Sequence, residues 1–145
     1  MQAVTRGVEV GIDIERMDPR FASEQIPEQF FSPREVAQLR ALPEDQQTAA
    51  FFRCWTRKEA YIKARGLGLA LALDSFDVSL GPDDPPVLMR AGDWSVQDLS
   101  AGGFGGDFNV PAGFAAAVVA EGPAFRALAC PVRCRAPEAH ELLPA

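Results

Sequence analysis

The chain has 145 residues, of which 48% are hydrophobic and 23% charged, and its formal net charge at pH 7 is −6. This composition is typical of one soluble globular domain and excludes an intrinsically disordered chain. The acidic balance argues against nonspecific nucleic-acid binding, and no apolar run reaches the roughly 20 residues that a membrane span needs. Residues 1–6 lack the pattern of a secretory signal, so a cytoplasmic protein is expected.

A β-strand is predicted over residues 8–14, where apolar and polar side chains alternate with a period of two. One face is apolar and consists of Val8, Val10, Ile12 and Ile14. The opposite face carries Glu9, Gly11, Asp13 and Glu15. Strand geometry places Asp13 and Glu15 on the same side, about 7 Å apart along the backbone.

The next segment, residues 16–31, is expected to be irregular, because Pro19 and Pro27 interrupt it. Phe30 and Phe31 form an apolar pair at its end and are expected to anchor the segment on the core.

A helix is predicted from Ser32 to about Leu42. Ser32 is suited to the N-cap, Pro33 to the first helical position and Glu35 to the acidic position of a capping box. Pro43 then ends the helix.

A longer helix is predicted from about Glu44 to Arg65, with Gly66 as its C-terminal stop. Glu59 and Lys63 are four residues apart and therefore share one face of this helix. Its apolar side is supplied by Phe51, Phe52, Trp55, Tyr61 and Ile62.

The second half of this helix is basic. Residues 53–65 hold five of the 14 basic residues of the chain against a single acid, Glu59. The five are Arg53, Arg57, Lys58, Lys63 and Arg65. Such a concentration would attract an anionic ligand or an acidic partner, and a solvated helical face is the alternative.

The last third of the sequence predicts strands separated by turns. The strands are expected at 75–80, 94–99 and 114–120, with turns at 81–86 and 101–107. The order of elements predicts an α+β fold in which an antiparallel sheet packs on the long helix. The tail from residue 131 onwards is rich in Pro, Arg and Glu and is expected to be peripheral.

The composition of the chain argues against several kinds of site. Cys54, Cys130 and Cys134 are an odd number, and His140 is the single histidine, so zinc binding and Ser-His-Asp catalysis are poorly supported. The glycine-rich stretches at 66–69 and 102–106 lack the lysine of a phosphate-binding loop.

If the first strand packs on the long helix, Asp13, Glu15 and Glu59 meet near Lys58 and Lys63. Such a carboxylate cluster suits Mg²⁺, which takes oxygen ligands and is commonly held by one or two carboxylates together with substrate phosphates. The lysines would hold those phosphates, and the chemistry implied is phosphoryl-type transfer. The competing interpretation is a solvent-facing strand beside an ordinary Glu59–Lys63 helix pair.

Two motifs resemble the 4′-phosphopantetheinyl transferases, most closely the surfactin-synthetase-activating type. They are Val10-Gly11-Ile12-Asp13-Ile14-Glu15 and Trp55-Thr56-Arg57-Lys58-Glu59-Ala60-Tyr61-Ile62-Lys63-Ala64. Phe30-Phe31-Ser32 with Glu35, Gly66-Leu67-Gly68-Leu69, Phe76-Asp77-Val78 and residues 113–118 continue the pattern, so the resemblance covers residues 8–120.

The resemblance implies transfer of 4′-phosphopantetheine from coenzyme A to a serine of an acyl or peptidyl carrier protein. It implies Mg²⁺ held by Asp13, Glu15 and Glu59, and deprotonation of the serine by Glu59 or a water that Glu59 positions. Lys63 would stabilise the phosphate or protonate the leaving group, and Lys58 would contact the phosphates of coenzyme A.

The resemblance also implies that this chain corresponds to the second half of a pseudodimer. On that basis residues 1–130 form the transferase domain and residues 131–145 a tail, while the upstream half would supply most of the coenzyme A contacts. Two alternatives stay open. One is an isolated half that binds a carrier protein or self-associates without catalysis. The other is a stand-alone holo-acyl-carrier-protein synthase that acts as a homo-oligomer.

Overall fold

The computed structural model describes residues 1–99, 110–123, 125 and 127, apart from the side chain of Leu69. The helices are α1 (Pro19–Ser23), α2 (Ile26–Phe30), α3 (Pro33–Ala41), α4 (Glu44–Arg65) and the short 3₁₀ turns η1 (Gly68–Ala70) and η2 (Leu73–Ser75). The strands are β1 (Val10–Arg16), β2 (Asp77–Val78), β3 (Leu88–Met89), β4 (Trp94–Asp98) and β5 (Phe114–Glu121). The predicted α+β class with an antiparallel sheet against one long helix is confirmed.

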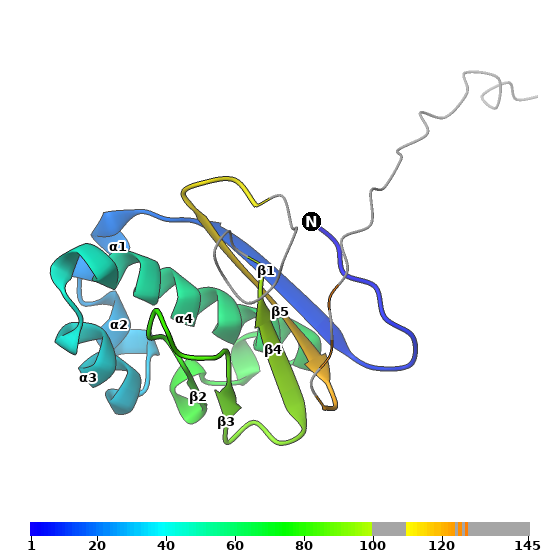
Figure 1. Ribbon diagram of the computed structural model, residues 1–145. Coiled ribbons are helices and arrows are strands. Elements are labelled where there is room, and N and C mark those ends of the chain that lie inside the picture. The colour runs from blue at the N-terminus through cyan, green and yellow to red at the C-terminus, as the bar shows by residue number, and fades with distance from the viewer. Residues whose placement is uncertain (100–109, 124, 126, 128–145) are drawn as a thin grey trace, which may run out of the picture.

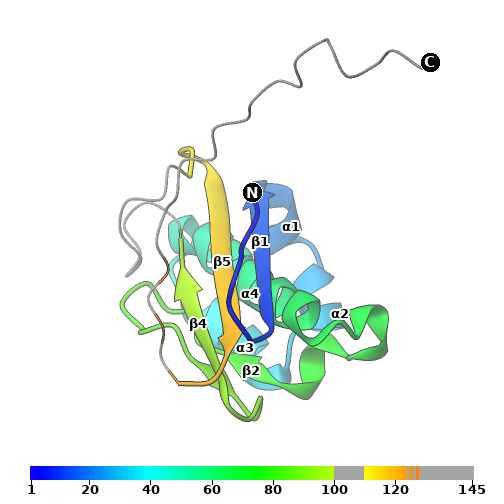
Figure 2. The ribbon, with the colours of Figure 1, turned by 90° about the vertical axis from the view of Figure 1, so that its right-hand side faces the viewer.

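Strand β5 is the centre of the main sheet. The order is β1-β5-β4, and both neighbours run antiparallel to β5 (Figure 2). Ala117 is paired with Asp13 on one side and with Asp98 on the other. Because β5 is covered on both faces, it is a continuous apolar run rather than an alternating one.

Helix α4 crosses one face of this sheet, while α1, α2 and α3 gather near one end of it (Figure 1). The contact face of β1 is the one that carries Gly11 and Asp13, both of which are buried. A Cβ atom on Gly11 would lie 2.1 Å from the carbonyl oxygen of Ala60 and 2.4 Å from the backbone nitrogen of Ala64. Glycine at this position is therefore what allows the strand backbone to touch the helix backbone.

The opposite face of β1 belongs to a second apolar cluster. Val10, Ile12 and Ile14 pack there, partly buried, against a small group of fully buried side chains from the other strands and the residues beside them. That group consists of Leu99, Val110, Ala116 and Val118. The two faces predicted for this strand are thus both buried to some degree, with the polar face turned toward the helix.

Helix α4 has the predicted bounds, and Gly66 ends it in the left-handed conformation with φ 62°. Its apolar side builds the core through aromatic contacts, including the stacked rings of Phe51 and Trp55, whose centroids are 5.8 Å apart. Tyr61 packs edge-on against Phe76 at 4.7 Å. These contacts fix the rotation of α4 and hence the side chains that it turns toward β1.

The expectation that residues 16–31 are irregular is wrong. They form α1 and α2, and Pro19 and Pro27 lie in the first turns of these helices. Proline is tolerated there because the first backbone N–H groups of a helix have no intrahelical partner. The predicted capping box of α3 is confirmed, since Ser32 and Glu35 bond each other's backbone nitrogens.

The strand expected at 75–80 is reduced to the two residues of β2. Its first residue, Ser75, is the last residue of η2, and β2 pairs with β3 in a separate two-stranded sheet. Side chains of this segment bond other elements instead: Asp77 accepts from the Ser32 hydroxyl and pairs with Arg90. The strands expected at 94–99 and 114–120 are present as β4 and β5, whereas the 101–107 turn and the 131–145 tail lie outside the described residues.

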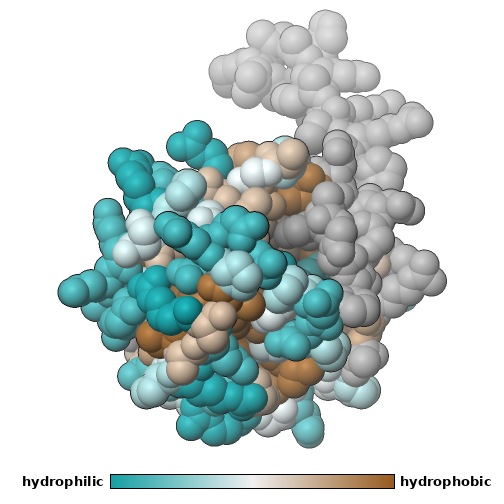
Figure 3. All heavy atoms as spheres, turned by 60° about the vertical axis from the view of Figure 1, so that its left-hand side comes forward, coloured by the Kyte–Doolittle hydropathy of each residue, from teal (hydrophilic) through white to brown (hydrophobic). Residues whose placement is uncertain are grey.

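The face formed by the helical end of the molecule is mostly hydrophilic, with small apolar areas between the polar side chains (Figure 3). Two phenylalanines from these helices, Phe21 and Phe30, are 45% and 40% exposed. Within the described ranges, no helix combines the length and the hydropathy required to cross a bilayer.

We expect Gly11→Ala to lower the free energy of unfolding by about 3 kcal/mol, because the added methyl group meets helix backbone that is unable to move aside cheaply. Gly66→Ala is the matched control. There the methyl group meets nothing within 4 Å, and only the left-handed backbone opposes it, at about 1 kcal/mol. Urea unfolding of both variants measures the difference, and an equal loss would contradict the close approach of β1 and α4.

Candidate functional site

The crossing of β1 and α4 brings Asp13 and Lys63 together. The Lys63 ammonium donates to Asp13 Oδ1 at 2.5 Å, although the two residues are distant in sequence. Asp13 is 4% exposed, whereas the Lys63 side chain is 51% exposed. The carboxylate is therefore fixed in the interior, and the ammonium reaches it from the surface.

Two further carboxyl groups flank this pair. Glu15 lies two residues beyond Asp13 on the same face of β1, and Glu59 lies one helical turn before Lys63. Burial, followed by the negative charge of Asp13, raises the pKa of both Glu15 and Glu59, while Lys63 lowers both. The predicted cluster of Asp13, Glu15, Glu59 and Lys63 is thus electrostatically coupled.

The second oxygen of Asp13, Oδ2, is buried without a hydrogen-bond partner. Among the described residues it is the one buried side-chain nitrogen or oxygen in that condition. An unpartnered buried oxygen costs free energy, and a bound cation or donor would satisfy it.

The donor chemistry of this cluster fits Mg²⁺, which prefers carboxylate oxygens. In the described part of the chain, however, no three Asp, Glu, His or Cys side chains already converge as ligands. The magnesium site stays a prediction, supported by the orphaned oxygen of Asp13 and by the coupling of the carboxyl groups.

A recess of about 560 Å³ opens beside Glu59 and Lys63. Its walls come from α2, from the end of α4 and from the η1–η2 segment, and most of its surface is apolar. Phe30, Ile62 and Leu71 are among the side chains that line it. The charged cluster therefore lies next to an apolar recess.

Lys58 lies elsewhere, and its predicted contact with coenzyme A phosphates does not fit the structure. Its side chain is 0% exposed and pairs with the equally buried Glu35 at 2.9 Å. The ammonium also donates to the backbone oxygens of Leu73 and Phe76. With every donor directed into the core, Lys58 anchors α4 to α3 and to the η2–β2 segment rather than facing a ligand.

Two arginines in the basic half of α4 also make internal contacts. Arg57 is 1% exposed and forms a bidentate pair with Asp98 of β4. Arg53 donates to the carbonyl of Leu80. The basic residues of this helix therefore form neither a solvated face nor a face directed wholly at a ligand. Some of them are buried in the core, and others lie at the rim of the site.

Sequence reasoning missed Asp98 and the buried role of Arg57. A signal existed in the spacing: Arg57 lies three residues after Cys54 and four before Tyr61, both of which are buried. That spacing places the arginine on the inner face of the helix.

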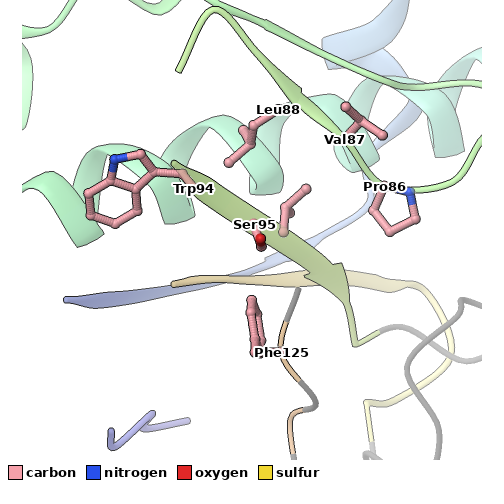
Figure 4. A pocket seen from close by; sticks show the side chains of 7 residues that line it. Pro86, Val87, Leu88, Trp94, Ser95 and Phe125 are labelled. Atoms are coloured by element: carbon pink, nitrogen blue, oxygen red, sulfur yellow. The ribbon is translucent and has the colours of Figure 1, made fainter. Parts of the chain in front are cut away.

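A second recess, of about 240 Å³, lies between β3 and β4 (Figure 4). Leu88 and Trp94 form part of its wall, and none of the described residues that line it carries a carboxyl, amine or imidazole group. It shares no residue with the Asp13 cluster and lacks the groups that the predicted chemistry needs.

Comparisons of this sequence with known proteins all point to one family. The model of the 4′-phosphopantetheinyl transferase superfamily matches residues 9–119. The 4′-phosphopantetheinyl transferase HetI of a Nostoc species is 42% identical over 97 residues, which are 67% of this chain and 40% of that protein. The transferase Sfp of Bacillus subtilis is 46% identical over 74 residues, which are 51% of this chain and 32% of that protein. The chain thus spans well under half the length of these relatives.

Solved structures support the fold. Holo-[acyl-carrier-protein] synthase of Thermotoga maritima is 22% identical, with a TM-score of 0.54 over 79% of this chain and 63% of that chain. A structure described as a Chronobacterium ammoniagenes ACPS–CoA complex is 17% identical, with a TM-score of 0.54 over 82% of this chain and 100% of that chain.

We expect Lys58→Met to lower the free energy of unfolding by about 3–5 kcal/mol, because it leaves the buried Glu35 carboxylate without its counter-charge. Arg65→Met is the matched control on the same helix. Arg65 is exposed and its guanidinium bonds the hydroxyl of Tyr61, so its removal leaves no buried carboxylate unpaired and should cost about 1 kcal/mol. Chemical unfolding would show the difference, and similar losses for the two variants would contradict the structural role of Lys58.

The raised pKa values of Glu15 and Glu59 predict a pH dependence of the metal-free chain. The two glutamates contribute fully to the free energy of unfolding below the pKa of glutamate in the unfolded chain, about 4.3. This contribution is lost as the pH rises through their raised pKa values in the folded chain. Glu59→Gln should therefore gain stability relative to the unmodified chain as pH increases across that window.

Urea unfolding in a metal chelator, at a series of pH values from acid to neutral, measures this relative gain. Glu44→Gln is the control, because Glu44 is an exposed carboxylate at the start of the same helix. If the two substitutions followed the same pH profile, the coupling of Glu59 to Asp13 would be refuted.

Proposed function

The chain belongs to the 4′-phosphopantetheinyl transferase superfamily, and from that premise we propose that it carries the metal-binding half of an enzyme that modifies carrier proteins. The reaction is transfer of 4′-phosphopantetheine from coenzyme A to a serine of an acyl or peptidyl carrier protein. The observation that carries this proposal is the meeting of Asp13, Glu59 and Lys63 where β1 crosses α4.

In this proposal Asp13, Glu15 and Glu59 hold Mg²⁺. Asp13 would use its buried, unpartnered Oδ2, and the two glutamates would supply further carboxylate oxygens. When bound, the ion would neutralise charge on the pyrophosphate of coenzyme A. Strand β1 and helix α4 hold the carboxylates in position, because the two elements are in direct backbone contact.

Glu59 is the proposed base. Its carboxyl group lines the recess beside Lys63, where the hydroxyl of an incoming serine would come within reach of a base. Glu59, or a water that it positions, would take the proton of the carrier serine as the serine oxygen bonds to the phosphorus that bears pantetheine.

Lys63 is proposed to act on the other side of the same phosphorus. The pyrophosphate P–O bond breaks there, and adenosine 3′,5′-bisphosphate leaves with the bonding electrons. The half-exposed ammonium of Lys63 is placed to stabilise the leaving oxygen or to give it a proton.

The apolar recess beside Glu59 and Lys63 is the proposed entry for the pantetheine arm and for the apolar surface around the carrier serine. An apolar wall excludes water from the reacting phosphate and so strengthens the electrostatic contacts around it. Phe30, which is 40% exposed at the rim, would contact the incoming group.

The coenzyme A phosphates need further cations. With Lys58 buried, Lys63 is the one lysine of this chain that can reach them, because the sequence contains two lysines in all. This agrees with the proposal that a second half completes the site, because the matched segment is only 40% of the HetI relative. Formation of the site between copies of this chain is the alternative, and size-exclusion chromatography distinguishes the two.

The direct test incubates the chain with coenzyme A, Mg²⁺ and an apo carrier protein, with and without an added upstream half from a relative. We expect mass spectrometry to show the phosphopantetheine increment on the carrier when the site is complete. The same mixture with Asp13→Ala should give no increment, because the metal loses its buried ligand.

Asp13→Ala is expected to keep its fold, since it removes a charge whose second oxygen has no partner. Circular dichroism and urea unfolding provide that control. Transfer by Asp13→Ala at the unmodified rate would contradict the assignment of Asp13, and absence of transfer under every condition would contradict the proposed activity of this chain.

A further inference from the structure

Lys63 holds the position in which a cation would neutralise Asp13. Its ammonium is 2.5 Å from Asp13 Oδ1, and Oδ2 of the same carboxylate has no partner. A carboxylate that is 96% buried needs a positive partner or strong donors, because its desolvation is otherwise uncompensated. Lys63 bonds one oxygen of the carboxylate and leaves the other oxygen without a partner.

Asp13 and Lys63 differ in how freely their side chains can move. Asp13 is fixed by its strand and by the helix packed on it, whereas the Lys63 side chain is half exposed and ends on a flexible four-carbon stem. When the pair separates, the Lys63 ammonium regains its hydration at the surface. The cost of separation therefore falls on the buried Asp13 carboxylate, which then needs another cation.

The surrounding charge favours such an exchange. Asp13, Glu15 and Glu59 carry three negative charges when ionised, and Lys63 returns one positive charge, so two negative charges remain uncompensated. A divalent cation compensates this excess better than one ammonium does.

We propose that Lys63 is the counter-ion of Asp13 in the metal-free chain and must release this carboxylate before a divalent cation can be held there. This inference rests on the metal site of the proposed function. The release turns the ammonium outward, toward the space where an anionic ligand would lie. Lys63 would thus become available to a phosphate only when the metal is in place, which couples the two binding events through one side chain.

The first test is calorimetric titration of the full chain with Mg²⁺. Lys63→Met should bind Mg²⁺ about three- to tenfold more tightly than the unmodified chain, because the metal no longer competes with an ammonium. Arg65→Gln removes the same charge from the same helix end, but Arg65 bonds the hydroxyl of Tyr61 rather than a carboxylate of the cluster. It should change the affinity less than twofold.

The second test measures the accessibility of the Lys63 amine directly. The chain has two lysines, and Lys58 is fully buried, so Lys63 is the one lysine accessible to an amine-acetylating reagent. Peptide mass spectrometry should show that Mg²⁺ raises the acetylation rate of Lys63 several-fold, while Lys58 stays unmodified in the folded chain as an internal control.

The outcomes separate this inference from the proposed function. Mg²⁺ binding by the unmodified chain, with no gain in Lys63→Met and no change in Lys63 acetylation, would overturn the inference and leave the metal site intact. Absence of Mg²⁺ binding by both chains would overturn the metal site and the inference together. Tighter binding in Lys63→Met with faster acetylation in the unmodified chain is the expected result.

Discussion

The backbone contact between β1 and α4 at Gly11 is the constraint on which the other features depend. A strand usually lies on a helix through layers of side chains, yet here the strand backbone reaches the carbonyl of Ala60 and the nitrogen of Ala64. That approach lets the short side chain of Asp13 reach the ammonium of Lys63. A larger residue at position 11 would separate the two elements, and the charged cluster would lose its geometry before any of its own residues changed.

Adjacent positions of α4 serve opposite purposes. Lys58 and Arg57 are buried and are held by Glu35 of α3 and Asp98 of β4, respectively. Glu59, the next residue, faces the recess. Breaking a buried ion pair by removing one partner is costly, so the inward pairs strongly oppose rotation of α4 about its axis. The orientation of Glu59 is therefore set by neighbours that do not touch the reacting groups.

Local patterns predicted much of this molecule. The capping signals of α3, the bounds of α4 and the alternating faces of the first strand follow from short-range chemistry, and the structure agrees with them, although the strand begins at Val10 rather than Val8. Errors arose where distant residues decide the outcome. Lys58 resembles a ligand lysine in sequence, and its burial depends on Glu35, which only the tertiary fold brings near. Pro19 and Pro27 interrupt a pattern in sequence but begin short helices in space, because the first helical turn tolerates proline.

The left-handed Gly66 that ends α4 has an electrostatic consequence. Lys63 lies in the last turn of this helix, and its own carbonyl accepts from the Gly66 nitrogen. The aligned peptide dipoles of a helix place a partial negative charge of about half an electron at its C-terminus. The field of the backbone therefore adds to that of the three carboxylates and attracts any cation near this end of α4. Part of the affinity of the site for positive charge is thus set by where the helix stops, independently of which side chains surround it.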